Sequence, residues 1–456
     1  MKRMYLEGTF PRKITSVFLA AMASVFLLYT GPDGYAHIVE SKYAALCLLC
    51  GLYLGALALV FFCHDVTGKL RVRGLGARLV RLSWPQRFAA AYLLLTWVSA
   101  LVSENFPDTL IGMSRYEGAL TITLYCLVFF CVSAWAQPGK WFLWVFAASM
   151  TLQNGLCILQ LAGANPLALY PQGYTWFDAG VRYSGAYLGT IGNTGLLGAV
   201  YCIAIPVFLL AICKGSGRSR LLLLIPLAGS AYVAMRMDVL ACFVGLGTGL
   251  ALSLPFALAR TTRLRWALLL TLACAGFATL AVLFFFDPGA GFFHELHELL
   301  RGRAQPQFGS GRLYIWENVL RLVPHHILFG AGPDTMAAAG IEPFTRWDGN
   351  LGKWLVSGID AAHSEYLNIL YHQGVFALAA YLALLGCTLV PALRRAGREP
   401  YASVCTSAAV CYAVQACFGI SMCVSAPFLW ICLGLLCRDA AAGCACAAEP
   451  APETQP

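Results

Sequence analysis

Long apolar runs alternate with short polar connections along nearly the whole chain. A helix needs about 20 apolar residues to cross the hydrocarbon core of a bilayer, and twelve runs reach or approach that length. The predicted spans are residues 14–30, 43–63, 88–104, 118–136, 141–162, 187–213, 221–235, 239–258, 266–286, 370–392, 402–419 and 425–437. The pattern therefore predicts an all-α polytopic membrane protein with about twelve transmembrane helices.

Composition agrees with this fold class. Of the 456 residues, 59% are hydrophobic and only 12% are charged, whereas a soluble domain carries about twice that charged fraction. The first apolar run follows several Lys and Arg residues, as in a signal peptide. A turn-forming sequence at residues 31–34 follows it in place of a small-x-small cleavage site, so we interpret this run as a retained first span.

One long polar segment, residues 287–366, interrupts the apolar pattern. It divides the chain into a bundle of nine spans (1–286), this large loop (287–366) and a bundle of three spans (367–438). The tail (439–456) is rich in Ala, Pro and Glu, a composition that predicts disorder. Because the loop holds most of the polar chemistry outside the spans, we expect the catalytic residues there.

Lysine and arginine set the expected orientation, because they accumulate in cytoplasmic loops. With the N-terminus inside, 21 of the 31 Lys and Arg residues fall on the inner side, and every inner loop holds at least one. Both termini are then cytoplasmic, the large loop is extracytoplasmic, and the expected location is the plasma (inner) membrane. The net charge of +9 reflects this topology and not nucleic-acid binding, which needs a soluble basic face.

The 19 cysteines do not predict a disulfide framework. Most fall inside apolar runs, where cysteine behaves as a small hydrophobic residue, and the large loop contains none. Cys47 and Cys50 have C-x-x-C spacing but lie within a predicted span, whereas zinc sites use four polar ligands.

Cations on the outer side are exceptions to the charge bias. Arg115, Arg182 and Arg236 each lie close to the end of a span, beside apolar sequence. A guanidinium in such a place needs an anion, and its planar fork suits phosphate oxygens. The alternative is that each arginine reaches lipid headgroups or pairs with a nearby acid, Arg115 with Glu117 and Arg236 with Asp238.

His363 lies just before the tenth span, between Asp360 and Glu365. If the helix starts near residue 361, His363 and Tyr366 share a face. Histidine exchanges protons near neutral pH, which suits a general base that deprotonates a sugar hydroxyl. The alternative is a histidine that only caps the helix.

Other histidines give weak signals for metal binding. His294 and His297 are three residues apart, which is not the spacing of an H-E-x-x-H zinc site. With the leucines around them, they fit better on an amphipathic helix that lies on the membrane surface. His325 and His326 follow a proline in a turn. The sequence therefore predicts no metal site and no cofactor.

Two motifs in the large loop resemble a known family. The first is Ser310-Gly311-Arg312-Leu313-Tyr314-Ile315-Trp316, followed by Leu328-Phe329-Gly330-Ala331-Gly332-Pro333-Asp334. The second is Ala362-His363-Ser364-Glu365-Tyr366-Leu367, followed by Gly374-Val375-Phe376. Together they resemble the domain of O-antigen ligases and Wzy-type polymerases. Upstream, Gly189-Thr190-Ile191-Gly192-Asn193 and the turn at Arg236 are similar to further family features, so the resemblance covers roughly residues 110–390.

The resemblance implies a function and a set of roles. The family transfers glycans from undecaprenyl diphosphate to a glycan, lipid or protein acceptor on the outer face of the plasma membrane. It has an all-helical type-C glycosyltransferase architecture and uses neither metal nor nucleotide. By this resemblance, His363 activates the acceptor hydroxyl, while Arg312 and Arg236 bind the diphosphate with help from Arg182 and Arg115. Asp360, Glu365, Tyr366 and Trp316 support the site.

The sequence departs from the family pattern at two places. Ser364 stands where the family usually has asparagine after the histidine. An acidic residue, Asp238, lies beside Arg236, and its charge would oppose the binding of phosphate there. The motifs do not separate ligase from polymerase activity.

Two other function classes compete with this interpretation. A transporter or flippase would place ionisable residues at mid-membrane depth or carry broken helices in paired positions, but here the polar residues gather at one surface. The main mid-membrane polar pair, Gln153 and Asn154, more often joins helices. A peptidoglycan-type glycosyltransferase shares the substrate chemistry, but the motifs around Arg312 and His363 fit it less well.

Overall fold

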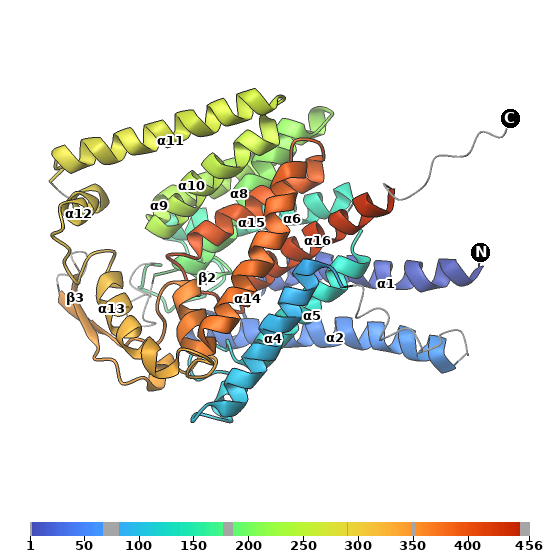
Figure 1. Ribbon diagram of the computed structural model, residues 1–456, viewed down its shortest axis with the longest axis horizontal. Helices are drawn as coiled ribbons and strands as arrows, with labels where there is room; N and C mark the ends of the chain where they lie inside the picture. The colour runs from blue at the N-terminus through green and yellow to red at the C-terminus, as the bar shows by residue number, and fades with distance from the viewer. Residues whose placement is uncertain are drawn as a thin grey trace.

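The computed structural model describes residues 2–66, 82–137, 139–176, 186–289, 291–348 and 353–446, and this part is mostly helical (Figure 1). The helices that match predicted spans are α1 (Lys2–Ala21), α2 (Ile38–Val66), α4 (Trp84–Val102), α5 (Ala119–Trp135), α6 (Lys140–Leu161), α8 (Thr194–Lys214), α9 (Leu224–Met237), α10 (Leu240–Leu258), α11 (Thr262–Phe285), α14 (Glu365–Arg395), α15 (Pro400–Gln415) and α16 (Ala426–Cys446). Each predicted apolar segment thus contains a helix, which confirms the helical class.

Seven helical segments in the described part are long and apolar enough to cross a membrane. They are Gly34–Cys63, Lys140–Leu161, Thr194–Lys214, Arg218–Met237, Leu240–Leu258, Thr262–Phe285 and Glu365–Arg395. The chain is therefore a membrane protein by length and hydropathy, and the count of twelve spans stays a prediction. Helix α11 lies along the edge of the bundle (Figure 1) and exposes apolar side chains such as Phe277 and Phe285, as expected for a helix that faces lipid.

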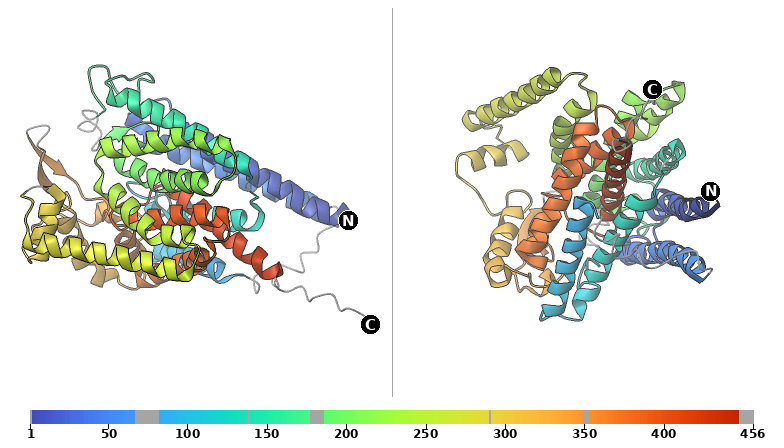
Figure 2. Two further views of the ribbon diagram at one scale, coloured as in Figure 1. Left: turned by 90° about the horizontal axis from the view of Figure 1, so that it is seen from above. Right: turned by 45° about the vertical axis from the view of Figure 1, so that its right-hand side comes forward.

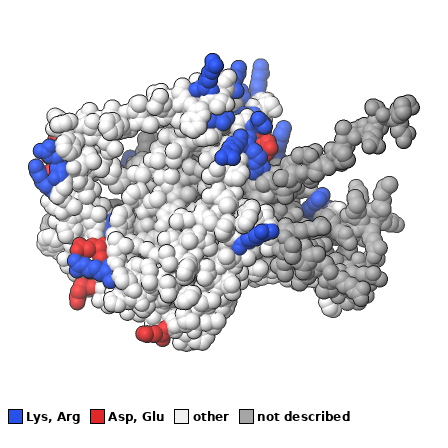
Figure 3. Space-filling view, in the orientation of Figure 1, with Lys and Arg blue, Asp and Glu red and all other residues white. Residues whose placement is uncertain are grey.

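Short elements of the large loop gather at one end of the bundle. They are α12 (Gly291–Leu300), α13 (Arg312–Leu322) and the antiparallel hairpin of β3 (Phe344–Asp348) and β4 (Lys353–Ser357). Helix α1 begins and helix α16 ends toward the opposite end (Figures 1 and 2). On the face drawn in Figure 3, most Lys and Arg side chains also lie away from the loop. This arrangement agrees with the expected charge bias.

The sixth predicted span begins later than expected. Residues 187–193 form a small antiparallel hairpin, β1 (Tyr187–Leu188) with β2 (Gly192–Asn193), and α8 starts only at Thr194. The Asn193 side chain caps α8 by accepting hydrogen bonds from the backbone N–H groups of Gly195 (2.8 Å) and Leu196 (3.3 Å). The glycines at 189 and 192, both with positive φ, allow the turn that precedes the cap. The prediction that residues 187–193 belong to the span was wrong.

The predicted disordered tail is also partly wrong. Helix α16 continues to Cys446, eight residues into the segment 439–456. Alanine has the highest helix propensity, and alanines dominate residues 440–446. Residues 447–456 lie outside the described part of the chain.

The chain does turn between the seventh and eighth predicted spans, but later than expected, because Arg236 still belongs to α9. Helix α9 ends at Met237 and α10 begins at Leu240. Asp238 ends α9 in the left-handed conformation with φ 51°, which short polar side chains tolerate better than most residues.

Helix α14 is kinked where the large loop docks onto it. Gly374 has φ 84° and ψ 176° inside the helix, which frees carbonyl groups in the preceding turn. The backbone N–H groups of Ala331 and Gly332 donate to the carbonyls of Tyr371 and His372, both at 2.9 Å. The contact is backbone to backbone, since a Cβ on Gly374 would lie 2.2 Å from the Leu328 carbonyl oxygen. The Gly-x-Gly motif is therefore a docking motif for the loop.

A small apolar cluster holds α13 against the start of α14. Its buried members include Ile315 and Val319 from α13, Ile359 and Ala362 from the segment before α14, and Tyr371 from α14 itself. This cluster is separate from the main core of the bundle. It brings the Arg312 motif and the His363 motif, about 50 residues apart in sequence, to one place.

Candidate active site

His363 lies on a short segment whose backbone is fixed on both sides. The Ala362 N–H donates to the Asn368 Oδ1 (2.7 Å), and the Ala362 carbonyl accepts a hydrogen bond from the Trp316 indole Nε1 (2.8 Å). Helix α14 begins at Glu365 after the cap residue Ser364. The expected start near residue 361 was wrong, because His363 has φ 49° and lies outside the helix. His363 and Tyr366 therefore do not share a helical face.

Arg312 is the first residue of α13, the helix whose Trp316 contacts this segment. Its guanidinium donates to the Gly309 carbonyl (Nη1, 2.7 Å) and to the Phe418 carbonyl (Nε, 3.3 Å). The Phe418 ring packs on Trp316, 6.1 Å between centroids, and Trp316 in turn binds the residue before His363. The motifs of Arg312 and His363 thus meet through Trp316 and Phe418.

No carboxylate within the described residues forms an ion pair with Arg312. Burial lowers the pKa of the Arg312 guanidinium, but an arginine remains protonated in proteins. Its contacts are therefore neutral carbonyl groups, and its charge is not balanced by a bonded acid. A partly buried cation of this kind can bind an anion such as a phosphate.

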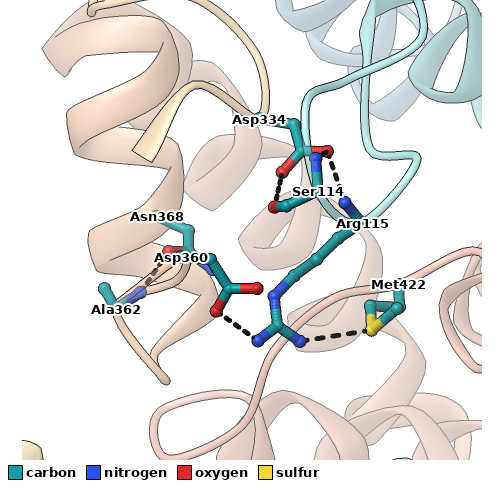
Figure 4. A network of polar contacts seen from close by, with 7 residues as sticks. All are labelled: Ser114, Arg115, Asp334, Asp360, Ala362, Asn368 and Met422. Carbon is teal, nitrogen blue, oxygen red and sulfur yellow. Dashed lines mark hydrogen bonds and ion pairs between the residues drawn. The ribbon is translucent and has the colours of Figure 1, made fainter. Parts of the chain in front are cut away.

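Arg115 has a partner that the sequence did not reveal. Its Nη2 forms an ion pair with Asp360 Oδ1 at 2.5 Å, and its Nη1 contacts the Met422 sulfur at 3.5 Å (Figure 4). The pairing considered with Glu117 is absent from the described ion pairs. Arg115 would have to exchange a carboxylate for phosphate in order to bind a diphosphate, so its expected role is less direct than that of Arg312.

Asp334 anchors the loop that carries Arg115. Its side chain is buried and accepts hydrogen bonds from the Arg115 N–H (2.7 Å), the Ser114 N–H (3.2 Å) and the Ser114 hydroxyl (3.0 Å) (Figure 4). The loop approaches so closely that a Cβ on Gly112 would lie 2.2 Å from Asp334 Oδ2. Asp334 closes the Gly-x-Gly motif, but nothing in the sequence pointed to this partner loop, since about 220 residues separate the two.

The other predicted site residues take different places. Arg236 is exposed at the end of α9 and forms no ion pair with Asp238 in the described structure. Arg182 lies outside the described residues. Glu365 is buried and accepts a hydrogen bond from the Tyr381 hydroxyl, and the Tyr366 hydroxyl donates to the Ala413 carbonyl (2.7 Å). Glu365 and Tyr366 therefore bond into the bundle, while Trp316 and Asp360 lie against the candidate site.

Glu117 is a partly buried carboxyl group in the loop before α5, which the sequence analysis considered only as a partner of Arg115. The Tyr125 hydroxyl donates to its Oε1 (2.6 Å), and the Ser421 hydroxyl lies 3.5 Å from its Oε2. Burial raises the pKa of Glu117 to about 8. The ordinary pKa of a glutamate is 4.5, so the unfolded chain has lost this proton at neutral pH. The folded protein still binds it.

This pKa predicts a pH-dependent stability. The contribution of Glu117 is fully present below pH 4.5 and is lost as the pH rises toward 8, because the unfolded state binds fewer protons there. Glu117→Gln mimics the protonated acid and removes this loss, which is on the order of a few kcal/mol near pH 7. We expect a higher Tm than wild type in detergent at pH 7.5 and a much smaller difference at pH 5. An equal Tm difference at both pH values would contradict the assignment.

One group of side chains in the described part could hold a metal ion. Ligand atoms of Asp287, His297 and Glu298 lie within 4.8 Å of one another. These atoms already have partners, since His294 bonds Asp287 (2.7 Å) and Arg303 bonds Glu298 (3.3 Å). The His294 contact lowers the pKa of Asp287. The ion pairs account for the cluster, and the cation Arg303 opposes the binding of a metal ion there.

Comparison with known proteins identifies one domain. Residues 222–382 match the family model for O-antigen ligase. This range contains Arg236, Arg312 and His363 and excludes Arg115 and Arg182. No curated protein matches the chain.

Proposed function

We propose that this protein transfers a glycan from undecaprenyl diphosphate to an acceptor hydroxyl, because residues 222–382 match the family model for O-antigen ligase. The match to the family model and the apolar helices support glycan transfer by a membrane protein. The donor, the acceptor and the membrane side belong to the proposal. Its acceptor is a lipid anchor, a second glycan or a protein, which leaves ligase and polymerase activity as the two forms of the same chemistry.

One observation carries the proposal. Arg312, a cation without a bonded carboxylate, lies on the helix whose Trp316 binds the residue before His363. A base and a cation without a direct ion pair in one region are what a displacement at a sugar carbon needs. The acceptor oxygen must lose a proton, and the departing diphosphate gains negative charge.

The proposed roles follow from this pairing. His363 takes the proton of the acceptor hydroxyl while the oxygen attacks the sugar carbon that bears the diphosphate. Arg312 binds the phosphate oxygens, which carry more charge as the bond breaks. Arg236, exposed beside the apolar surface, would bind the diphosphate from the lipid side, and Arg182 and Arg115 are weaker candidates for the same anion. The arginines supply the positive charge, so the reaction is proposed to need no metal.

The orientation of the site is part of the proposal. The described elements of the large loop lie at one end of the bundle, and α1 begins and α16 ends toward the other (Figures 1 and 2). With cytoplasmic termini, as the charge bias indicates, the site faces the outer leaflet of the plasma membrane. A transporter remains the alternative, but no observation in the described structure favours it.

The test is transfer by the purified protein in liposomes. The assay supplies a labelled glycan on undecaprenyl diphosphate together with extracted envelope acceptors, with and without EDTA. We expect a transferred product and the same rate in both conditions. A rate that falls with EDTA and returns with a divalent ion would contradict the metal-free mechanism. Hydrolysis or movement of the donor without transfer would contradict the enzyme class.

A further inference from the structure

A small cavity is lined by residues on both sides of His363, although His363 itself does not line it. These residues are Asp360 and Ala361 on one side and Glu365 on the other. The cavity volume of about 50 Å³ holds a few water molecules and is too small for a sugar. The titratable and charged groups around it are Tyr92 of α4, Arg115 and Glu117 of the loop before α5, Tyr125 of α5, Asp334, Asp360, and Glu365, His372 and Tyr381 of α14.

Four buried polar atoms of this cavity have no hydrogen-bond partner. They are Arg115 Nε, Glu365 Oε2, His372 Nε2 and Gln373 Oε1. Buried polar groups are nearly always hydrogen-bonded, to protein or to ordered water. The set contains both a donor and acceptors. A small network of water molecules can form hydrogen bonds with both kinds of group. The geometry therefore indicates a hydrated cavity.

The carboxylates of the cavity are not equivalent. Asp334 is saturated by the loop at Ser114 and Arg115, Asp360 pairs with Arg115, and Glu117 bonds Tyr125. Glu365 has a bond from Tyr381 to Oε1 only, and its Oε2 is buried without a partner. Glu365 is also held in place, since its N–H donates to the Ala416 carbonyl at 2.8 Å.

We propose that this hydrated cavity is the outlet for the proton that His363 removes from the acceptor, with Glu365 as the group that receives it. The inference rests on the proposed glycan transfer. The acceptor O–H bond breaks as the imidazole gains the proton, and the bonding electrons of the donor sugar leave with the diphosphate. The imidazolium then gives its proton to a water molecule beside the cavity, and a proton passes along the cavity waters to Glu365 Oε2.

The proton leaves through the open side of the cavity. Asp360 lines it and its side chain is 36% exposed, so water there connects with the outside. Release from Glu365 restores the carboxylate for the next turnover. Glu365 acts through His363 and is a positioning and proton-accepting residue without contact to substrate.

The experiment compares Glu365→Gln with Glu317→Gln in the liposome assay. Glu317 is an exposed carboxylate of α13 paired with Arg321, so its variant controls for the change of acid to amide. We expect Glu365→Gln to lower kcat about tenfold or more, without a change in KM for the donor. The solvent deuterium isotope effect on kcat should rise, and small buffers such as imidazole should restore the rate in proportion to their concentration. Glu317→Gln should match wild type.

Three outcomes would decide against the outlet. Glu365→Gln could transfer at the wild-type rate, or it could lose activity with neither buffer rescue nor a larger isotope effect, which would show a structural role. If Glu365→Gln does not fold, Gln373→Leu replaces it, since leucine displaces the cavity water and should give the same buffer-dependent loss. If folded Gln373→Leu shows no buffer-dependent loss of activity, the proposal is also overturned. Failure of the wild type to transfer would instead contradict the proposed function.

Discussion

His363→Ala is expected to abolish glycan transfer while the protein still folds and reaches the membrane. A general base contributes about 10²–10⁴-fold to a rate, and alanine leaves the acceptor hydroxyl without one. The backbone at this position is held by neighbours, through Ala362 and its bonds to Trp316 and Asn368. Loss of the imidazole should therefore leave the loop in place. The measurement is kcat in liposomes, with folding followed by size-exclusion chromatography in detergent.

The matched control is His325→Ala. His325 is an exposed histidine of the same loop, in the turn after α13, and its loss should change kcat less than twofold. Transfer at the wild-type rate by His363→Ala would remove His363 from the mechanism. Equal losses in the two variants would show that the loop tolerates no substitution, and the role of base would then have no support.

Arg312→Lys is expected to fail almost as completely as Arg312→Ala. Lysine keeps the charge but not the planar fork that binds two phosphate oxygens at once. A preorganised donor to a developing anion is worth about 10²–10³-fold in kcat. Lysine also cannot reproduce both of the bonds that orient the guanidinium, to the carbonyls of Gly309 and Phe418. The loss should appear in kcat measured with saturating donor.

Arg321→Lys is the control for this substitution. Arg321 lies on the same helix, is exposed and pairs with Glu317 at 2.5 Å. An exposed pair of this kind contributes little, so the variant should keep wild-type kcat. If Arg312→Lys also kept wild-type kcat, the charge of residue 312 would serve only to attract the donor, and transition-state stabilisation would have to come from elsewhere.

The helical framework could be predicted from the sequence because each apolar run is a local signal. A helix lies on every predicted span, and the chain turns at Asp238 and Val239, at the end of the expected segment. Local signals failed where a few polar or glycine residues override hydrophobicity. Asn193 caps α8 after the hairpin of residues 187–193, and Ser364 caps α14 beyond His363.

The candidate site was predictable only in part, because its contacts are non-local. The motifs named His363, Arg312 and Trp316, and the structure brings their segments together through Phe418, a residue that no motif contained. The pairing of Arg115 with Asp360 joins residues 245 positions apart. A single sequence carries no signal for such a pair, and the nearest acid, Glu117, was the natural but wrong candidate.

The glycines show how sequence and structure explain each other. Gly330 and Gly374 are in the motifs, yet spacing alone gives no reason for them. In the structure a Cβ on Gly330 would lie 2.2 Å from the backbone of His372, because the loop and the kinked helix touch through their backbones. The glycines of the motif are therefore needed for close backbone packing. This packing holds the loop that carries Arg312 against α14.

The most direct test of the central claim is complementation in a strain that lacks this gene. Wild type and His363→Ala are expressed, and surface glycan is read together with the lipid-linked precursor in each leaflet. We expect only wild type to restore surface glycan, while His363→Ala accumulates precursor on the outer leaflet. The length of the restored glycan would separate polymerase from ligase activity. Precursor that accumulates on the inner leaflet would contradict the account, because the protein would then move its substrate across the membrane.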